Sequence, residues 1–430
     1  MPFWYPLLLA IIAQLYRLRV FLRSRHEPDY QLEVAQRFGK LPSAKLQNPI
    51  WIHAVSVGET NAAQPIIQHL LNMGLPVLVT NTTRTGAARV RTLFAKDIQN
   101  NQLEQHFLPI DTAKLMNEFI DIHQPRMVLL IETEIWPNLL AIVHQRKIPS
   151  MLMNARLSER SAKGYAKFSS LTKPMLEHLT RIAAQDQDTA NRFIGLGASG
   201  SKVTVTGSLK FDLTAPEANL ELAKKLKLDW QLDGRPVLFA ASTHEPEELE
   251  ILNAFKALHV EFPRALLIIA PRHPERFDRV AALIEEQGLR YTRRSADQSV
   301  NGTTSVFLAD SMGEMWTWYA LSKMAFVGGS LAETGGHNPL EAASLGVPVV
   351  MGAHTFNFAQ IVELLKAAGA LVQVNDAHAV MQVWRDWLLS ESQYEDAANA
   401  ALAVMHANQG ALKRQLDLVD DMLKSVCTKH

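Results

Sequence analysis

Short apolar runs alternate with longer amphipathic stretches from residue 50 onward. The runs have the length of β-strands, and the stretches between them, such as Ala62 to Met73 and Leu139 to Gln145, place apolar residues at helical spacing. This alternation is typical of βαβ units in a mostly parallel sheet. The strands predicted for the first half are Ile50 to Val55, Val77 to Thr80, Met127 to Ile131, Ser150 to Met153, Arg181 to Ala184 and Val203 to Thr206.

The same alternation restarts after residue 232. The strands predicted for the second half are Val237 to Ala241, Leu266 to Ala270, Val306 to Ala309, Met324 to Val327, Val347 to Met351 and Leu371 to Val374. Between the two series, Phe211 to Leu232 interrupts the strand rhythm and is predicted to be a linker. We therefore expect an α/β protein with two doubly wound, Rossmann-like domains at residues 26–212 and 213–380, which face a central cleft. Residues 381–430 are expected to form helices that pack back on the core.

The N-terminal segment, residues 1–25, differs from this soluble pattern. Phe3 to Tyr16 is apolar except for Gln14, and arginines follow it at positions 17, 19, 23 and 25. The run is shorter than the ~20 residues that span a bilayer comfortably, and its charges follow rather than precede it, unlike a secretory signal. The pattern favours a helical membrane anchor, which either crosses the cytoplasmic membrane or lies along its headgroups. A buried N-terminal helix is the alternative.

Composition excludes several classes of function. Apolar residues make up 47% and charged residues 20% of the chain, as in an ordinary globular enzyme. The 43 basic and 43 acidic residues balance, so nucleic acid is not an expected partner. A single cysteine, Cys427, excludes a disulfide framework and a cysteine-based zinc cluster. No metal site is expected, since histidines at zinc-ligand spacing and carboxylate-dense loops are absent. The phosphate-loop and dinucleotide fingerprints are absent too, which argues against an NTPase and a nicotinamide dehydrogenase.

The segment Gly328 to Glu341 is the most informative stretch of the chain. It contains two glycine pairs and follows an apolar strand candidate. Asn338 suits a helix N-cap, Pro339 the first helical position and Glu341 the third. A strand, a glycine-rich loop and a helix N-terminus together predict an anion site, with a phosphate on the loop amides and ribose hydroxyls on Glu341. The alternative is that Glu341 only closes a capping box with Asn338.

Carboxylates gather at the strand ends of the first half, where open α/β sheets bind ligands. Ser56-x-x-Glu59 matches a capping box, but the neighbouring Gly58 allows a substrate to approach closely, and Glu59 could act as a general base. Glu132 and Glu134 alternate about the end of another strand and are alternatives for the same role. The positions alone do not choose among the three.

Basic residues stand at other strand ends. Arg272 and His273 close a strand of the second half and suit a phosphate or carboxylate, although an exposed loop pair would look the same. Lys210 and Arg156 add positive charge to the expected cleft. Ser242 begins a polar segment after the first strand of the second half.

Taken together, these segments resemble the 3-deoxy-D-manno-octulosonic acid (Kdo) transferases of lipopolysaccharide biosynthesis. The resemblance runs in order from the N-terminal segment to about Phe358, and the Gly207-Ser208 pair, where the family usually has Gly-Asn, is a small departure. The segments that carry it are Ile52 to Glu59, Glu132 to Asn138, Asn154 to Ser158, Gly207 to Asp212, Ser242 to His244, Pro271 to Phe277 and Gly328 to Glu341.

This resemblance implies a GT-B glycosyltransferase without cofactor or bound metal. It would move Kdo with inversion from CMP-Kdo to a lipid A precursor (lipid IVA) at the cytoplasmic side of the cell inner membrane. Glu59 would be the general base and Glu132 a second carboxylate, with Ser56, Gly58 and Arg156 on the acceptor side of residues 26–212. Residues 213–380 would bind the donor nucleotide, and the donor-binding residues would be Lys210, Ser242, Arg272, His273, Gly328, Gly329, Gly335, Gly336, His337, Asn338 and Glu341. Two alternatives are another membrane-associated GT-B enzyme that uses a different nucleotide sugar and a non-catalytic binding scaffold.

Overall fold

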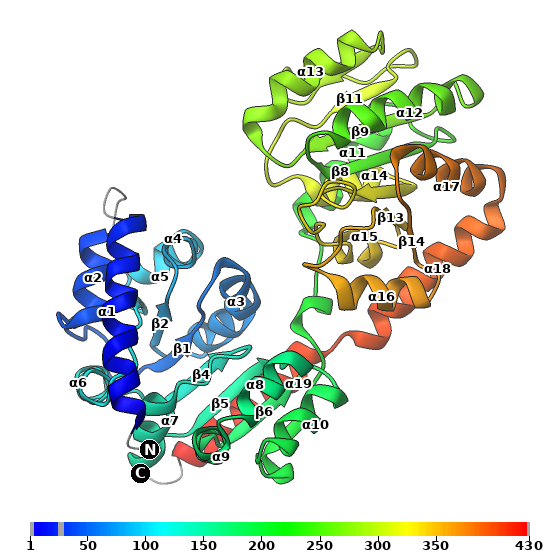
Figure 1. The fold of residues 1–430 in the computed structure, drawn as a ribbon. Coiled ribbons are helices and arrows are strands. Elements are labelled where there is room, and N and C mark those ends of the chain that lie inside the picture. Colours follow the sequence, from blue (N-terminus) through cyan, green and yellow to red (C-terminus); the bar gives the residue numbers. More distant parts are fainter. Residues whose placement is uncertain (1–3, 25–29, 428–430) are drawn as a thin grey trace. The chain divides into compact units, whose positions relative to one another are not determined.

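The chain forms two compact α/β units (Figure 1). The computed structural model describes residues 4–24 and 30–427. The first unit comprises Met1–Asp212 and Gln409–His430, and the second comprises Leu213–Asn408. The C-terminal segment expected at residues 381–430 is therefore divided between the units, because its last helix returns to the first.

A seven-stranded, all-parallel sheet forms the centre of the first unit. Its order is β3-β2-β1-β4-β5-β6-β7, so the winding direction changes between β1 and β4. The strands are β1 (Ile50–His53), β2 (Val77–Asn81), β3 (Leu103–Phe107), β4 (Met127–Ile131), β5 (Ser150–Ala155), β6 (Arg181–Ala184) and β7 (Val203–Val205).

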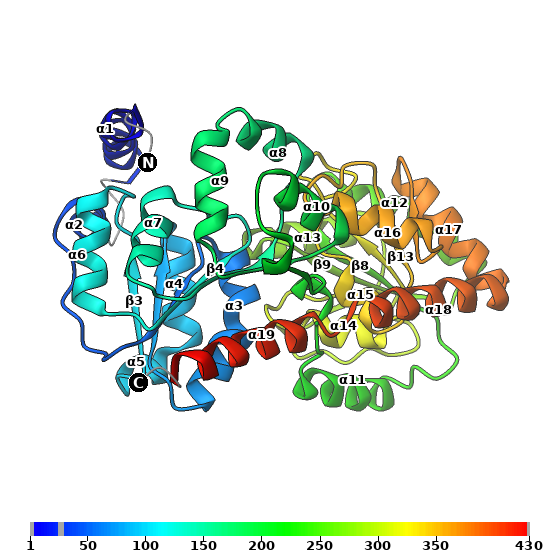
Figure 2. The same ribbon diagram turned by 90° about the horizontal axis from the view of Figure 1, so that it is seen from below.

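Helices cover both faces of this sheet, which explains why its strands are continuously apolar. Ile50 and Ile52 pack into the core on one face, and Trp51 packs into the core on the other. Several helices begin at a side-chain N-cap, namely Ser56, Thr83, Thr112, Ser158 and Asp186. The helices are α1 (Trp4–Ser24), α2 (Tyr30–Phe38), α3 (Val57–Asn72), α4 (Arg84–Leu93), α5 (Ala95–Gln99), α6 (Ala113–His123), α7 (Pro137–Gln145), α8 (Glu159–Ala166), α9 (Ser169–His178), α10 (Gln187–Gly195) and α19 (Ala411–Cys427). Helix α19 lies against α3 (Figure 2).

The second unit repeats this plan with another seven-stranded parallel sheet. Its order is β10-β11-β9-β8-β12-β13-β14, and the winding changes between β8 and β12. The strands are β8 (Val237–Thr243), β9 (Leu266–Pro271), β10 (Tyr291–Arg293), β11 (Val306–Leu308), β12 (Met324–Val327), β13 (Val349–Met351) and β14 (Leu371–Gln373). The helices are α11 (Glu217–Asp229), α12 (Glu247–Glu261), α13 (Phe277–Glu286), α14 (Met315–Leu321), α15 (Leu340–Ser344), α16 (Ala359–Ala367), α17 (Ala377–Leu389) and α18 (Glu391–Asn408).

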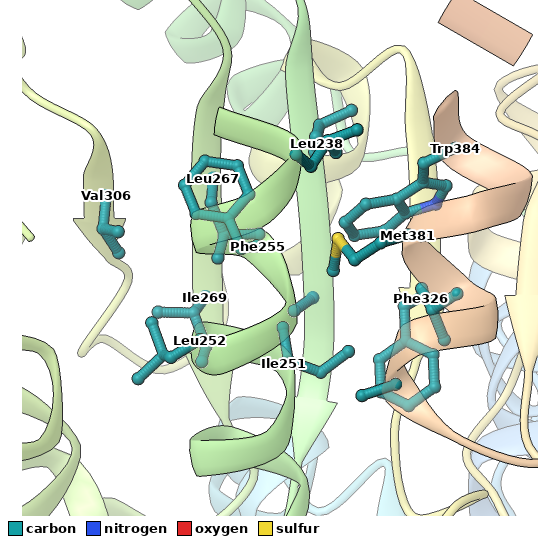
Figure 3. Close-up of a cluster of buried hydrophobic side chains, with 14 of the residues drawn as sticks. Leu238, Ile251, Leu252, Phe255, Leu267, Ile269, Val306, Phe326, Met381 and Trp384 are labelled. Atoms are coloured by element: carbon teal, nitrogen blue, oxygen red, sulfur yellow. The ribbon is translucent and has the colours of Figure 1, made fainter. Parts of the chain in front are cut away.

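The core of the second unit joins α12 and α17 to one face of this sheet (Figure 3). Ile251, Leu252 and Phe255 of α12 and Trp384 of α17 are completely removed from solvent. Burying a large apolar side chain contributes about 1.5–3 kcal/mol, so this contact fixes α12 firmly. It thereby sets the position of the α12 N-terminus, which begins at Glu247.

The N-terminal segment forms a helix, α1, whose two sides differ. Tyr5 and Val20 are buried, and the Tyr5 hydroxyl donates a hydrogen bond to Asp111 (3.1 Å). Ile11, Leu15, Leu18 and Leu22 form an exposed apolar stripe at helical spacing. None of the helices in the described parts of the chain combines the length and apolarity needed to cross a bilayer. Phe3 and Arg25 of the expected anchor lie outside the described residues.

The sequence predicted the two parallel sheets but missed some elements. Strands β3 and β10 were not expected, since Glu104, Gln105 and His106 break the apolar run of the former and the latter has three residues. The predicted linker was wrong in part, because most of it forms α11, which packs on α14 in the second unit. Several strands end one or two residues away from the predicted position.

Candidate active site

In the first unit, the loops that follow β1 and β4 leave neighbouring strands at the point where the winding changes. Such a switch point is where open α/β sheets bind ligands. The loop after β1 leads into α3 and carries Ser56, Gly58 and Glu59. The loop after β4 carries Glu132 and Glu134.

Glu59 is held at the start of α3 by a network related to a capping box. Its carboxylate accepts hydrogen bonds from the Val55 N–H (2.7 Å) and the Ser56 hydroxyl (3.0 Å), and its own N–H donates to Ser56 Oγ. A Cβ at Gly58 would meet only Ser56 Oγ, at 3.8 Å, so the side of the loop beside Glu59 is open. The helix cap therefore fixes the carboxylate in place.

The pKa of Glu59 is raised to about 7. Burial is the main cause, and the nearby carboxylates Glu134 and Glu132 add to it, while the hydrogen bonds from Val55 and Ser56 oppose it. A carboxylate that exchanges a proton near pH 7 has the pKa that general-base catalysis requires. The structural role and the chemical role of Glu59 are thus compatible.

Glu132 and Glu134 lie near Glu59 but differ from it in environment. Glu132 has a left-handed backbone (φ 63°), which is strained for a residue with a side chain. The Glu134 carboxylate accepts a hydrogen bond from Trp136 Nε1 (2.8 Å) and lies 3.6 Å from the buried His53. Glu59 is held by the helix cap, and its pKa of about 7 suits the role of a base.

Lys210 and Arg156 belong to the same region of the first unit. Burial lowers the pKa of Lys210, and Glu132 and Arg156 are close enough to influence that pKa in opposite directions. Lys210 lies in the short turn Leu209–Phe211, which Asn154 fixes by accepting the Leu209 N–H (3.1 Å). Asn154 is in turn held by Gln415 of α19 (2.9 Å). Sequence reasoning missed Gln415, because its partner lies 261 residues away.

In the second unit, three histidines meet where β8, β9 and β12 end. His244 Nε2 and His337 Nε2 are 2.8 Å apart with stacked rings, and His273 packs edge-on against His244. The pKa of His337 is lowered to about 4 by burial, and then by His244, Arg272 and His273. The pair is therefore neutral near pH 7, with one ring N–H donating to the other ring. Arg272 and His273 are exposed beside it.

The glycine-rich loop binds an anion, but this anion belongs to the protein itself. The completely buried Glu247 carboxylate accepts the N–H groups of His244 and of residues 329–332 at 2.8–3.2 Å. The prediction that a ligand phosphate uses these amides was therefore wrong for Gly329 and the three residues after it. Gly328 donates its N–H to Ala241 O. The sequence shows Glu247 three residues after His244, but it does not indicate that the Glu247 carboxylate binds the amides of the glycine-rich loop.

Glycine is required in this loop for space and for backbone conformation. Gly329, Gly335 and Gly336 have φ values of 65°, 94° and 73°. A Cβ at Gly328 would lie 2.6 Å from Ser242 O, and one at Gly335 would lie 2.4 Å from the Phe356 ring. Ser242 itself has a left-handed backbone (φ 54°) at the end of β8. The loop is thus folded against β8, and its glycines serve that close contact.

The helix after this loop begins one residue later than the sequence predicted. It begins at Leu340 instead of Pro339, and the Asn338 side chain accepts the Leu340 N–H (3.1 Å). Within the described residues, the Glu341 carboxylate accepts no hydrogen bond, so the capping box with Asn338, which was the alternative interpretation, does not form. Burial raises the pKa of Glu341 to about 7. A desolvated carboxylate without a donor is suited to hydroxyl groups of a ligand.

The structure places the predicted residues in two groups, one in each unit. The first unit holds Ser56, Gly58, Glu59, Glu132, Arg156 and also Lys210, which had been assigned to the donor. The second unit holds Ser242, Arg272, His273, Gly328, Gly329, Gly335, Gly336, His337, Asn338 and Glu341.

One cluster elsewhere in the first unit has the residue types of a metal site. Candidate ligand atoms of Glu104, His106 and His123 lie within 4.8 Å of one another. Histidine ligands of metals almost always bond through their second nitrogen as well. His106 Nδ1 and His123 Nε2 are buried and have no hydrogen-bond partner among the residues that the structure describes, and burial lowers the pKa of His123 to about 4. The cluster therefore lacks the hydrogen bonds that orient the histidine ligands of a metal centre.

Comparisons with known proteins agree with this organisation. The family described as 3-Deoxy-D-manno-octulosonic-acid transferase (kdotransferase) matches residues 33–213, and glycosyl transferases group 1 matches residues 245–403. The C-terminal CMP-Kdo binding domain of WaaA from Acinetobacter baumannii is 42% identical and covers 44% of this chain and 99% of that domain, with a TM-score of 0.43. The UDP-GlcNAc 2-epimerase of Neisseria meningitidis covers 85% of this chain and 100% of its own at 15% identity, with a TM-score of 0.54, which is a likeness of fold.

A full-length relative decides the family. The 3-deoxy-D-manno-octulosonic acid transferase of Bordetella pertussis is 41% identical over 429 residues, which cover 97% of this chain and 99% of the relative. Together with the two domain matches, this similarity shows that the chain belongs to the Kdo transferases, the glycosyltransferases of lipopolysaccharide biosynthesis.

Proposed function

We propose that this protein is an inverting GT-B enzyme that transfers Kdo from CMP-Kdo to a lipid A precursor, lipid IVA, with Glu59 as the general base. The observation that carries the proposal is the Glu59 carboxylate, fixed at the β1/β4 switch point with a pKa of about 7. In the reaction, Glu59 takes the proton of an acceptor hydroxyl, and the hydroxyl oxygen bonds to the anomeric carbon of Kdo. CMP departs with the electron pair of the broken bond.

Cationic side chains and neutral hydrogen-bond donors of the second unit suit the charges of CMP-Kdo. The donor carries a phosphodiester and a sugar carboxylate, and the exposed Arg272 and His273 flank the neutral His244–His337 pair. Hydrogen-bond donors that are held in place beside the departing phosphate can stabilise its charge without a metal. Glu341 would accept the ribose hydroxyls, and Asn338 and the glycines at 335 and 336 would border the nucleotide. Glu247 would keep the loop in shape without touching the donor.

The acceptor would bind to the first unit. Ser56 and Gly58 border Glu59, and Glu132, Arg156 and Lys210 supply further polar groups in the same region. Transfer requires the base and the donor sugar at one reacting carbon. The exposed apolar stripe of α1 would lie in the headgroup region of the inner membrane on its cytoplasmic side, beside the lipid acceptor.

Nucleotide selectivity separates this proposal from a GT-B enzyme that uses another nucleotide sugar. CMP should raise the melting temperature strongly and UDP weakly, because at equal concentration the ligand that binds the native state more tightly stabilises it more. Mass spectrometry of the lipid product after incubation with CMP-Kdo and lipid IVA should show added Kdo. A larger shift with UDP, or an unmodified lipid, would contradict the proposal.

A further inference from the structure

Two cavities of the first unit lie between α1 and the loop after β4. Their volumes are about 340 and 670 Å³, within the range of small-molecule pockets. Both are lined by Leu9 and Ile12 of α1 and by Glu134 and Trp136 of the loop. Because they share these residues on both sides, they form one groove, which we name the α1 groove.

The larger cavity of the α1 groove is lined mainly by apolar side chains. Apart from the shared residues, its walls include Ile135 of the loop, Tyr165 of α8, and Phe168, Leu171 and Met175 at α9. A groove of this kind accepts a hydrocarbon chain, because each methylene moved out of water contributes about 0.8 kcal/mol.

One end of the α1 groove reaches the candidate base. The smaller cavity is lined by Val55, Thr82 and Glu134. Val55 is the residue whose N–H binds the Glu59 carboxylate at 2.7 Å, and Glu134 is the largest charge influence on its pKa. A molecule that fills the groove therefore has its polar end beside Glu59.

The other end of the α1 groove borders a basic surface. Gly164 of α8 lines the larger cavity and also a neighbouring hollow, whose other walls are Glu159, Arg160, Lys163 and Lys167. Three of these four side chains are cationic and exposed, which suits a phosphate group. Apolar walls between a catalytic carboxylate and a basic rim fit a phosphorylated lipid.

We propose that the α1 groove binds an acyl chain of the lipid acceptor. This inference rests on the proposed function for the identity of the acceptor. The occupant is the acceptor rather than a bilayer phospholipid, because the groove is continuous with the residues around Glu59. Helix α1 would thus have two roles, with its outer stripe facing the membrane and its inner side forming one wall of the substrate site.

A glycine in the wall allows the groove to be narrowed without disturbing the core. A Cβ at Gly164 would meet no atom within 4 Å, and replacing a helical glycine favours the helix. Gly195→Leu is a matched control, since Gly195 is also helical, also has no atom within 4 Å of a Cβ and lines neither cavity.

Gly164→Leu should raise the KM for a long-chain acceptor about tenfold, as loss of two buried methylenes would do, with an unchanged KM for CMP-Kdo. Gly195→Leu should change neither.

A second matched pair separates the groove from the membrane surface. Ile12 lines both cavities, whereas the adjacent Ile11 is 61% exposed and lines neither. Ile11→Ser should weaken binding to phospholipid vesicles more than Ile12→Ser, because Ile11 belongs to the exposed apolar stripe. Only Ile12→Ser should raise the KM measured in detergent micelles.

Photocrosslinking tests occupancy without requiring catalysis. An acceptor with a photoreactive acyl chain should label peptides from residues 132–138 and 161–175 in the parent and in Gly195→Leu, and label them much less in Gly164→Leu. Equal labelling of all three proteins, labelling elsewhere, or equal labelling by a photoreactive phospholipid would overturn the groove proposal. Labelling of the groove together with an absence of Kdo transfer would instead show that the proposed function fails.

Discussion

Each unit places a glutamate in the first turn of the helix that follows its first strand, and the two glutamates have different roles. In each unit the first strand, β1 or β8, lies at the switch point and leads into a helix whose first turn contains a carboxylate. Glu59 accepts one backbone N–H and one hydroxyl and is partly exposed. Glu247 accepts five backbone N–H groups and has no contact with solvent.

The number of hydrogen-bond donors around each carboxylate explains why Glu59 and Glu247 have different roles. Five backbone amides donate hydrogen bonds to the Glu247 carboxylate and replace its hydration, so this side chain becomes a fixed part of the loop. Two donors are too few to offset the burial of Glu59 beside other carboxylates, and its pKa rises to about 7. One carboxylate is therefore structural, while the other can exchange a proton.

The largest expected effect is the loss of transfer rate when the Glu59 carboxylate is removed. Glu59→Gln should lower kcat by at least 100-fold, the usual contribution of a general base, and should leave the fold intact. Single-turnover release of CMP measures the rate, and circular dichroism checks the fold. Glu118→Gln, an exposed position in α6, is the control. A rate within tenfold of the parent would mean that Glu59 is not the base.

The matching change in the second unit should act on stability. Glu247→Gln replaces one accepting oxygen with an amide that cannot accept the loop N–H groups, and should destabilise the protein by about 2–4 kcal/mol. Thermal denaturation should show a melting temperature lower by roughly 5–10 °C. Glu250→Gln, exposed on the same helix, should change it little. An unaltered melting temperature in Glu247→Gln would refute the structural role of these hydrogen bonds.

The pH dependence of the reaction should follow Glu59. Its pKa of about 7 predicts that kcat/KM falls about tenfold for each pH unit below 7, since only the ionised form accepts a proton. Initial rates between pH 5.5 and 8.5 at constant ionic strength measure this. Vesicle binding over the same range is the control for loss of membrane contact. A profile that stays flat down to pH 5.5 is incompatible with Glu59 as the base.

The smallest expected effect is a gain in stability. The pKa of Glu59 is raised from 4.5 to about 7 on folding, so the native state binds more protons in that window. Stability therefore falls as the pH rises from 4.5 to about 7 and stays at the lower level above it. Glu59→Gln removes this penalty and should be slightly more stable than the parent at pH 8. The difference should shrink as the pH falls toward 4.5. Urea denaturation at several pH values measures it, and a Glu59→Gln protein less stable than the parent at pH 8 would reverse the comparison.

The sequence predicted more of the architecture than of the contacts. Glu59 and Glu341 were both candidates with a capping box as the alternative, and the structure gave opposite answers. Glu59 forms the cap because the Ser56 hydroxyl and the Val55 N–H are within reach, whereas the helix at Glu341 starts one residue later, with Asn338 bonded to Leu340. Spacing along the chain was the same in both cases. The backbone conformation before the helix made the difference.

By itself, the sequence determined the presence of two parallel sheets, the order of most of their strands along the chain, and the family. Strands buried on both faces must be continuously apolar, and ordered motifs are properties of the chain. Only the tertiary structure decided that Glu247 occupies the amides of a loop more than 80 residues away, that the last helix returns to the first unit, and that α1 lines a groove. The physical reason is that a hydrogen-bond donor or an apolar wall selects its partner by proximity in space, which sequence separation does not encode.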